Sequence, residues 1–376
     1  MVEWKKLGEV SGRNKGIPIT AGQMSELASK DGNVRVFAAG STIADIDESL
    51  LPKNCAHKLP SIIVKSRGYI DFEFYEKPFT HKNEMWSYSF DNKQEGKFIY
   101  YFLTTQTDFF RNKAKANSVK LPQLCVADTD NYLIPIPSLE EQTRIVGILD
   151  TFTSAIDNLK EQIAQRRKQY EYYRDQLLDL EGKPGVEMKP LGDIGEFIRG
   201  NGIQKNDFVE VGFSCIHYGQ IHAQYGFSAS KSISKIAESL YKRCKKAQKG
   251  DVVLATTSED AEGVAKPFVW LGNEDAAVSG DAFVFHHNQN GKFIGHQFIT
   301  HRFMQFKKKY ATGAKVVRIS GENMAKYKVA LPPLDEQSRI VSILDSFEAS
   351  IQNLEAQLEQ RQKQYEYYRN KLLTFE

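Results

Sequence analysis

The sequence predicts an α+β protein in which two globular α/β domains alternate with two long helices that pair as an antiparallel coiled coil. Three observations lead to this architecture. A long segment occurs twice, both copies carry a heptad pattern of apolar residues, and short β-rich runs occur only outside the copies. The repeat sets the boundaries: residues 1–136 and 182–331 form the domains, and residues 137–181 and 332–376 form the helices.

The two helical segments are copies of one sequence. They align without a gap at an offset of 195 positions, and 27 of the 45 positions are identical, including the heptapeptide KQYEYYR. After the first residues neither copy contains proline, and glycine occurs only at Gly147. Because proline and glycine are the main helix breakers, each copy can form one continuous helix.

Apolar residues recur in both copies with a spacing of four and three residues. This spacing continues over five heptads, with one polar seam position in each copy, Arg166 and Arg361, and predicts a coiled coil. In the first copy the seam consists of Ile145, Leu149, Phe152, Ile156, Leu159, Ile163, Tyr170, Tyr173, Leu177 and Leu180. The tyrosines are therefore interpreted as packing residues. Antiparallel pairing is favoured, with pseudo-two-fold symmetry, because parallel pairing would require the second domain to return the chain along the whole helix.

The domains show mixed secondary-structure signals. Residues 34–37, 61–64, 251–255 and 282–286 predict strands, and residues 96–116 and 292–310 predict helices. Each helical run leads into a matched turn, at residues 116–120 and 311–315, again 195 positions apart. The domains also begin alike, with KKLGEV at residues 5–10 and KPLGDI at residues 189–194. Their central parts diverge almost completely.

The charge distribution points to a polyanionic partner. The net charge is only +3, but residues 301–318 carry six basic residues and no acid, residues 111–120 carry four and no acid, and residues 231–249 carry seven against one glutamate. A basic stretch can simply be solvated surface. Two of these three lie at equivalent places in the repeat, which favours nucleic acid.

Sequence motifs for catalysis or metal binding are absent. There is no GxxxxGK[ST] loop, complete dinucleotide fingerprint, HExxH, paired CxxC or amino-methyltransferase motif. The four scattered cysteines are expected to be reduced thiols. No apolar stretch of about 18 residues is present and no leader is expected, so a cytoplasmic protein without membrane contact is expected.

The chain resembles the DNA-specificity (S) subunits of Type I restriction–modification systems along its whole length. In that family two variable target-recognition domains alternate with two similar long helices. The helix openings here are IPSLEEQTRI at residues 136–145 and LPPLDEQSRI at residues 331–340. The domain openings at residues 7–10 and 191–194 resemble the family's LGDI-like strand. The second domain adds CIHYGQIHAQYG at residues 215–226, GDVVLATTSED at residues 250–260 and ATGAKVVRI at residues 311–319.

The resemblance implies a non-catalytic subunit. Each recognition domain would read one half of a split, asymmetric double-stranded DNA target, with the helices setting the spacer. Two methyltransferase subunits would dock on the helices, and two restriction/translocase subunits would join for cleavage. S-adenosylmethionine, ATP and Mg²⁺ are expected in those partners, and no cofactor or metal in this chain.

Candidate DNA-binding residues are basic side chains for phosphates and polar loop residues for bases. In the first domain they are Arg13, Lys15, Lys65, Arg67, Arg111, Lys113, Asn117, Ser118 and Lys120. In the second domain they are Tyr218, Gln220, His222, Thr256, Thr257, Ser258, Lys307, Lys308, Lys309, Lys315 and Arg318. Lys120 and Lys315 rank first because the repeat relates them.

Candidate partner-binding residues are the repeated polar residues at the helix starts: Glu141, Gln142, Arg144, Glu336, Gln337 and Arg339. Helix capping and local ion pairs would explain the same residues. Two other classes of function stay open. One is a coiled-coil adaptor that binds no specific DNA, and the other is an enzyme with an unrecognised site in a divergent central part.

Overall fold

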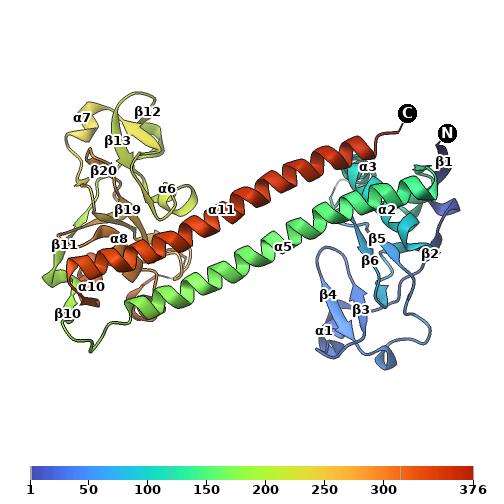
Figure 1. Cartoon of the computed structure of the whole chain (residues 1–376), viewed down its shortest axis with the longest axis horizontal. Helices are drawn as coiled ribbons and strands as arrows, with labels where there is room; N and C mark the ends of the chain where they lie inside the picture. The colour runs from blue at the N-terminus through green and yellow to red at the C-terminus, as the bar shows by residue number, and fades with distance from the viewer. Residues whose placement is uncertain (1, 119, 314, 376) are drawn as a thin grey trace. The chain divides into compact units, whose positions relative to one another are not determined.

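The computed structural model describes residues 2–118, 120–313 and 315–375 and divides into two compact units. Unit 1 comprises Met1–Lys160 and Ala356–Glu376, and unit 2 comprises Glu161–Glu355. The long helix α5 (Leu139–Leu178) begins in unit 1 and ends in unit 2, whereas α11 (Leu334–Leu372) begins in unit 2 and ends in unit 1 (Figure 1). Each unit is therefore built from a domain and parts of both helices.

In its described residues, unit 1 holds sheets with the strand orders β2-β8-β5-β6, β4-β3-β7 and β1-β9. The strands are β1 (Glu3–Lys6), β2 (Gly12–Asn14), β3 (Val34–Phe37), β4 (Ile43–Ile46), β5 (Ser61–Lys65), β6 (Asp71–Tyr75), β7 (Phe79–His81), β8 (Trp86–Ser89) and β9 (Leu133–Ile136). The helices are η1 (Leu7–Glu9), α1 (Ala21–Leu27), η2 (Glu48–Leu50), α2 (Lys93–Thr105), α3 (Thr107–Asn117) and α4 (Val126–Asp130).

The core of unit 1 forms between the β5 sheet and α2. β5 reads SIIVK and is buried on both faces over its first four residues, as expected for an inner strand. Helix α2 begins at Asn92, whose side chain accepts hydrogen bonds from the amides of Gln94 and Glu95. Its apolar residues, among them Phe98 and Phe102, then pack in one cluster with Ile62 of β5.

In its described residues, unit 2 holds two five-stranded sheets, β11-β21-β17-β19-β14 and β12-β15-β13-β20-β16, and the pairs β10-β23 and β18-β22. The strands are β10 (Glu187–Pro190), β11 (Gly195–Arg199), β12 (Phe208–Val209), β13 (Phe213–Ile216), β14 (Ser228–Ala229), β15 (Ser234–Ile236), β16 (Lys246–Ala247), β17 (Val252–Ala255), β18 (Thr257–Ser258), β19 (Lys266–Trp270), β20 (Ala276–Val278), β21 (Ala282–His287), β22 (Val317–Arg318) and β23 (Lys328–Leu331). The helices are η3 (Leu191–Asp193), η4 (Lys205–Asp207), α6 (Tyr218–Ala223), α7 (Glu238–Tyr241), α8 (Gly291–Gln297), α9 (His301–Tyr310) and α10 (Gly321–Ala325).

The four predicted strands and both predicted helical runs are present, but each run is broken once. Residues 96–116 fall in α2 and α3, which meet at Gln106, and residues 292–310 fall in α8 and α9. In unit 2 the Thr300 side chain caps α9 by accepting from the amide of Phe303. The two breaks lie at equivalent places in the repeat, which makes them a shared feature of the two units.

One prediction about the domain openings is wrong. The segments at residues 7–10 and 191–194 are single 3-10 turns, η1 and η3, not strands. The strands lie just before them, where β1 and β10 pair antiparallel with β9 and β23. Leu7 and Leu191 are fully buried, and their amides donate to the carbonyls of Tyr132 and Tyr327. This tertiary contact turns the chain immediately after the strand.

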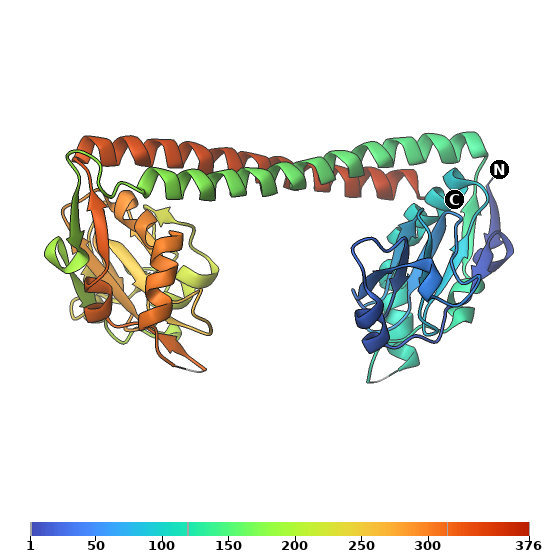
Figure 2. The same ribbon diagram turned by 90° about the horizontal axis from the view of Figure 1, so that it is seen from below.

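Helices α5 and α11 pair antiparallel, as the sequence predicts (Figure 2). In unit 1, Phe152 of α5 stacks on Tyr368 of α11 with ring centroids 5.4 Å apart. In unit 2, Phe347 of α11 stacks on Tyr173 of α5 at 5.5 Å. The 195-residue offset converts one pair into the other with the helices exchanged, which is the contact pattern of antiparallel pseudo-symmetry.

The start of each long helix packs on a domain. Ile145 and Leu149 belong to the unit 1 core, and Ile340 and Leu344 belong to the unit 2 core. An equivalent ion pair reinforces each junction. Lys97 of α2 lies 2.7 Å from Asp150 of α5, and Lys292 of α8 lies 2.8 Å from Asp345 of α11.

Candidate nucleic-acid interface

In unit 2 the candidate DNA-binding loops form a two-stranded ladder. β18 follows the buried strand β17, β22 follows α9, and they pair with Thr257 opposite Arg318 and Ser258 opposite Val317. Thr312 forms a further bridge to Arg318. The structure therefore brings together Thr257, Ser258 and Arg318, which lie about sixty positions apart in the sequence.

A cavity of about 260 Å³ adjoins this ladder. Two guanidinium groups, hydroxyls, an amide and a carboxylate line it, so it offers both hydrogen-bond donors and acceptors. Its polar lining residues are Arg199, Thr256, Thr257, Asp281, Tyr310, Thr312, Arg318, Ser320 and Asn323. Such a mixture suits contacts to phosphates and to base edges.

Arg199, Asp281 and Asn323 line this cavity but are not among the residues that the sequence predicted. Arg199 ends strand β11 just before a Gly-Asn-Gly turn, and its Nε donates to the carbonyl of Gly280 at 2.9 Å. Asp281 accepts from the Thr257 hydroxyl at 3.3 Å. For Arg199 the sequence does hold a signal, namely an arginine at the end of a strand just before a glycine-containing turn. Asp281 and Asn323 reach the cavity only through the tertiary fold.

The three candidate residues on α6 have different hydrogen-bond partners, and only one of them contacts the ladder. His222 Nε2 lies 2.9 Å from the carbonyl oxygen of Thr257, so it joins the ladder. The Gln220 amide instead donates to Ser234 on β15 at 2.7 Å. Tyr218 starts the helix, where its amide donates to Ser279. The site is thus assembled from α6, β18 and β22 together.

Unit 1 has an equivalent loop pair with different side chains. Arg67 follows β5, as Thr257 follows β17, and it bridges to Gln123, which occupies the repeat position of Arg318. Next to it the Arg111 guanidinium covers the ring of Tyr69 at 5.1 Å and donates to its hydroxyl. Tyr69 is 60% exposed, which leaves an aromatic face open beside positive charge.

The other first-domain candidates are dispersed. Asn117 and Lys113 lie on α3 near Asp128, and Lys65 is paired with Glu73. Arg13 lies on the edge strand β2 and pairs with Asp130, and Lys15 follows that strand. No hydrogen bond or ion pair among the described residues joins Arg13 or Lys15 to Arg67 or Arg111. Ser118 and Lys120 lie in the segment that leads to Gln123.

Four second-domain lysines were candidates, and one is buried. Lys308, Lys309 and Lys315 are exposed. Lys307 is 3% exposed, and its ammonium donates to the carbonyls of Val264, at 2.9 Å, and Glu262. Burial lowers the pKa of Lys307 to about 8. It ties α9 to the loop after β18 and has no access to a phosphate in this structure.

Among the candidate partner-binding residues, the charged side chains are exposed and the two glutamines are buried. Glu141 pairs with Arg144 at 2.6 Å and Glu336 with Arg339 at 2.7 Å, and these pairs face solvent. The guanidinium of Arg144 lowers the pKa of the Glu141 carboxyl.

Gln142 and Gln337 are 3% and 0% exposed. Each amide donates to a proline carbonyl at the start of its own helix, Pro137 or Pro332, at 2.9 Å. These glutamines tie the first turn of each helix to the segment just before it, so a docking surface here would consist of the exposed ion pairs.

Two further features of residues 2–118, 120–313 and 315–375 concern metal binding and the membrane. No group of three His, Cys, Asp or Glu side chains gathers as it would to hold a metal ion. Within the same residues, no helix has the length and apolar character needed to cross a membrane.

Comparisons with known proteins agree with this organisation. A family model described as Type I restriction modification DNA specificity domain matches residues 1–166 and 184–361. The Type I restriction enzyme EcoR124I/EcoR124II specificity subunit of Escherichia coli is 32% identical over 341 residues, which cover 85% of this chain and 81% of that protein. A putative specificity subunit of Haemophilus influenzae is 28% identical and covers 100% of this chain and 96% of its own length.

The fold has solved counterparts. The S subunit of a Type I restriction–modification system from M. genitalium superposes with a TM-score of 0.59 at 16% identity, covering 100% of this chain and 97% of that one. A chain from a structure concerned with complex assembly and conformational transition of a type I R-M system gives a TM-score of 0.56 at 15% identity. Both comparisons show that this chain shares the fold of those proteins. With the repeat, the paired helices and the matches to both halves in view, the chain belongs to the family of DNA specificity (S) subunits of Type I restriction–modification systems.

Proposed function

We propose that this specificity subunit reads a split, asymmetric double-stranded DNA target, one half-site with each domain. By family it is a non-catalytic subunit that determines DNA target recognition within its complex. Residues 1–136 and 182–331 are assigned as the recognition domains, and residues 137–181 and 332–376 as the helical spacer.

The single observation that carries this proposal is the repeated loop pair with unlike chemistry. Arg67 with Gln123 in unit 1 and Thr257 with Arg318 in unit 2 occupy the same place in their units. A symmetric scaffold that presents different side chains at one position is what two readers of different half-sites require. Around both pairs, exposed lysines such as Lys120 and Lys315 supply sequence-independent attraction to phosphates.

The proposed partners follow from the doubled scaffold. Two methyltransferase subunits dock on the helices near the repeated ion pairs of Glu141 and Glu336, and two restriction/translocase subunits join the complex. Methyl transfer and cleavage, with S-adenosylmethionine, ATP and Mg²⁺, belong to those partners. The complex acts on DNA in the cytoplasm.

The test is long-read methylation mapping of a host that expresses this chain with its neighbouring methyltransferase gene. Adenine methylation at one split, asymmetric motif is the expected result. Replacing residues 1–136 or residues 182–331 with the domain of a relative should change one half-motif and leave the other intact. A complex that contains the methyltransferase and methylates no motif would contradict the proposal and favour the adaptor alternative.

A further inference from the structure

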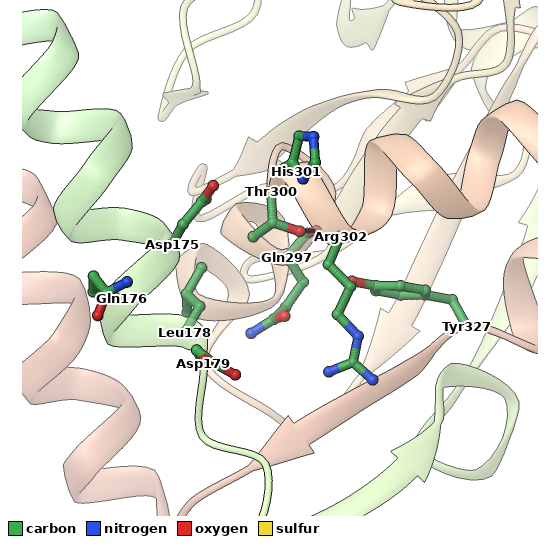
Figure 3. Close-up of a pocket in the computed structure, with 9 residues that line it drawn as sticks. All are labelled: Asp175, Gln176, Leu178, Asp179, Gln297, Thr300, His301, Arg302 and Tyr327. Atoms are coloured by element: carbon green, nitrogen blue, oxygen red, sulfur yellow. Dashed lines mark hydrogen bonds between the residues drawn. The ribbon is translucent and has the colours of Figure 1, made fainter.

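A cavity of about 320 Å³ opens in unit 2 where the end of α5 meets the turn between α8 and α9 (Figure 3). Asp175 of α5 and Asp179, which follows the end of α5, line one side, and Gln297, Arg302 and Tyr327 line the other. None of these residues belongs to the candidate nucleic-acid interface. The cavity lies instead beside a scaffold helix.

Unit 1 has a cavity of about 420 Å³ at the equivalent place, where the end of α11 meets the turn between α2 and α3. Seven of its lining positions are related to lining positions of the first cavity by the 195-residue offset. Tyr132 there corresponds to Tyr327. Because the repeat preserves the cavity in both units, the cavity is a property of the shared scaffold.

The two cavities differ in chemistry. Phe102 and Thr374 in unit 1 replace Gln297 and Asp179 of unit 2, so the unit 2 cavity alone has this amide and this acid. Gln297 is 4% exposed, and Figure 3 shows its amide extending between Asp179 and Arg302. Among the described residues its Nε2 has no hydrogen-bond partner. A buried donor without a partner is unfavourable, so the site is suited to a ligand that supplies an acceptor.

The charges around the cavity define that ligand further. Arg302 is engaged with Glu181 at 3.3 Å, and Asp175 with Arg174 at 2.9 Å. The carboxylate of Asp179 has no ion-pair or hydrogen-bond partner among the described residues, so it is open to a cation. A basic amino acid within a polypeptide satisfies both groups, since its carbonyl oxygen accepts from Gln297 while its side chain meets Asp179.

We propose that the two cavities receive the same segment of two methyltransferase subunits, and that the unit 2 cavity holds a lysine or arginine of that segment between Asp179 and Gln297. This inference rests on the proposed function, in which that partner docks in two copies on α5 and α11. The duplicated cavity accounts for the two copies, and the free carboxylate accounts for the basic side chain. In unit 1 the same segment meets the neutral Thr374 and the ring of Phe102.

Site-specific photo-crosslinking tests whether the cavities share an occupant. A photoreactive residue replaces His301, which lines the unit 2 cavity, or Gln106, its repeat equivalent in unit 1, in complexes co-expressed with the methyltransferase. Mass spectrometry should identify the same methyltransferase peptide from both positions, and that peptide should contain lysine or arginine. Crosslinks to unrelated peptides, or none to the methyltransferase, would overturn the proposal.

Reciprocal exchange between the repeats tests the ion pair. Asp179→Thr gives unit 2 the unit 1 residue, and Thr374→Asp does the reverse, so each variant carries a side chain that its cavity already accommodates in the other unit. Native mass spectrometry of titrations should show that Asp179→Thr weakens binding of one of two methyltransferase subunits about fivefold, and that Thr374→Asp strengthens binding of the other.

The outcomes separate this inference from the proposed function. A wild-type chain that recruits no methyltransferase contradicts the proposed function itself. Another outcome is that the wild-type chain and both variants bind two methyltransferase subunits with the same affinities. That result would contradict only the proposed ion pair in the unit 2 cavity. Circular dichroism of each free variant excludes loss of fold as the cause of weaker binding.

Discussion

At the scale of single residues, exposure decides which basic side chains can contact DNA. Lys120 and Lys315 stand at equivalent positions in the repeat, both are exposed, and each lies next to its unit's loop pair. Lys307 belongs to the same basic stretch as Lys315, yet it is buried and donates to backbone carbonyls inside the protein. The two kinds of lysine lead to different predictions.

We expect Lys120→Ala and Lys315→Ala to weaken DNA binding by the methyltransferase complex without changing its target motif. In the proposed interface each variant removes one phosphate contact, so the slope of log K against log salt concentration should become shallower by about 0.9. Fluorescence anisotropy between 50 and 200 mM salt, on the order of the physiological range, measures this. Lys160→Ala, an exposed lysine paired with Asp157 on α5, is the control and should leave the slope unchanged. Equal slopes for all variants would remove Lys120 and Lys315 from the interface.

Lys307→Met should destabilise unit 2 by about 1–3 kcal/mol at pH 7, because the carbonyls of Glu262 and Val264 lose their donor. The pKa of Lys307 is about 8 in the folded protein, below the ordinary lysine value of 10.5. The unfolded chain therefore binds more protons than the folded chain between these values, and the Lys307 contribution to stability rises with pH from about 8 to 10.5.

Urea unfolding of wild type and Lys307→Met at pH 7 and at about pH 9.5 measures this difference. The gap between the two midpoints should widen at the higher pH, and Lys308→Met, on the exposed side of α9, should show no such change. A gap that narrows with pH would mean that the folded protein favours the protonated amine.

At the scale of elements, α5 and α11 are held by contacts that occur once in each unit. The stacked pair of Phe152 and Tyr368 recurs as Phe347 and Tyr173. The first seam residues of each helix do not stack on the other helix in this way. Ile145 and Ile340 belong instead to the hydrophobic cores of their units. The heptad pattern is continuous, but its first positions contact a domain.

Phe152→Ala and Phe347→Ala should each lower the free energy of unfolding by about 1–3 kcal/mol, since each removes a partly buried ring and its stacking. The double variant should show the sum of the two losses within about 0.5 kcal/mol, because the two pairs share no contact. Urea unfolding measures all three, with Gln165→Ala on the exposed face of α5 as the control. Losses that differ strongly between the two phenylalanines would argue against equivalent packing.

At the scale of the whole molecule, two domains of unlike surface chemistry are attached to one pseudo-symmetric pair of helices. The helices have 40 and 39 residues and continue from one unit into the other. In the proposed function their length sets the spacer of the DNA target. Lengthening both helices by the same amount should therefore change the spacer alone.

Inserting three heptads after Ile163 and three after Leu358, positions that the repeat relates, should preserve the seam on both sides. The added length is roughly 31 Å, close to one DNA turn of about 34–36 Å, so each domain would again face its groove. Methylation mapping should return the same half-motifs with a spacer longer by roughly 9 base pairs. The insertion in α5 alone is the control and should abolish methylation by breaking the pairing. An unchanged spacer in the double insertion would contradict the spacer role.

The sequence alone determined the long helices and the four strands that it predicted, because these depend on local periodicity and on a repeat that can be read directly. It favoured antiparallel pairing through the path of the chain, and its motifs and doubled arrangement carried the resemblance to the family. It also named Thr257 and Arg318 of the ladder. For the loops it could give residue types but not their positions, since pairing across about sixty residues depends on the path of the whole chain.

The tertiary structure decided which polar residues are available. Gln142, Gln337 and Lys307 are residue types that often bind partners, but here they are buried and their side-chain nitrogens donate to nearby carbonyls. Packing of Leu7 and Leu191 converted two expected strands into 3-10 turns. The matching cavities beside α5 and α11 emerged only when helix ends and domain turns met. In each case the outcome depends on the energy of contacts between segments that are far apart in the sequence. A local sequence pattern carries no information about such contacts.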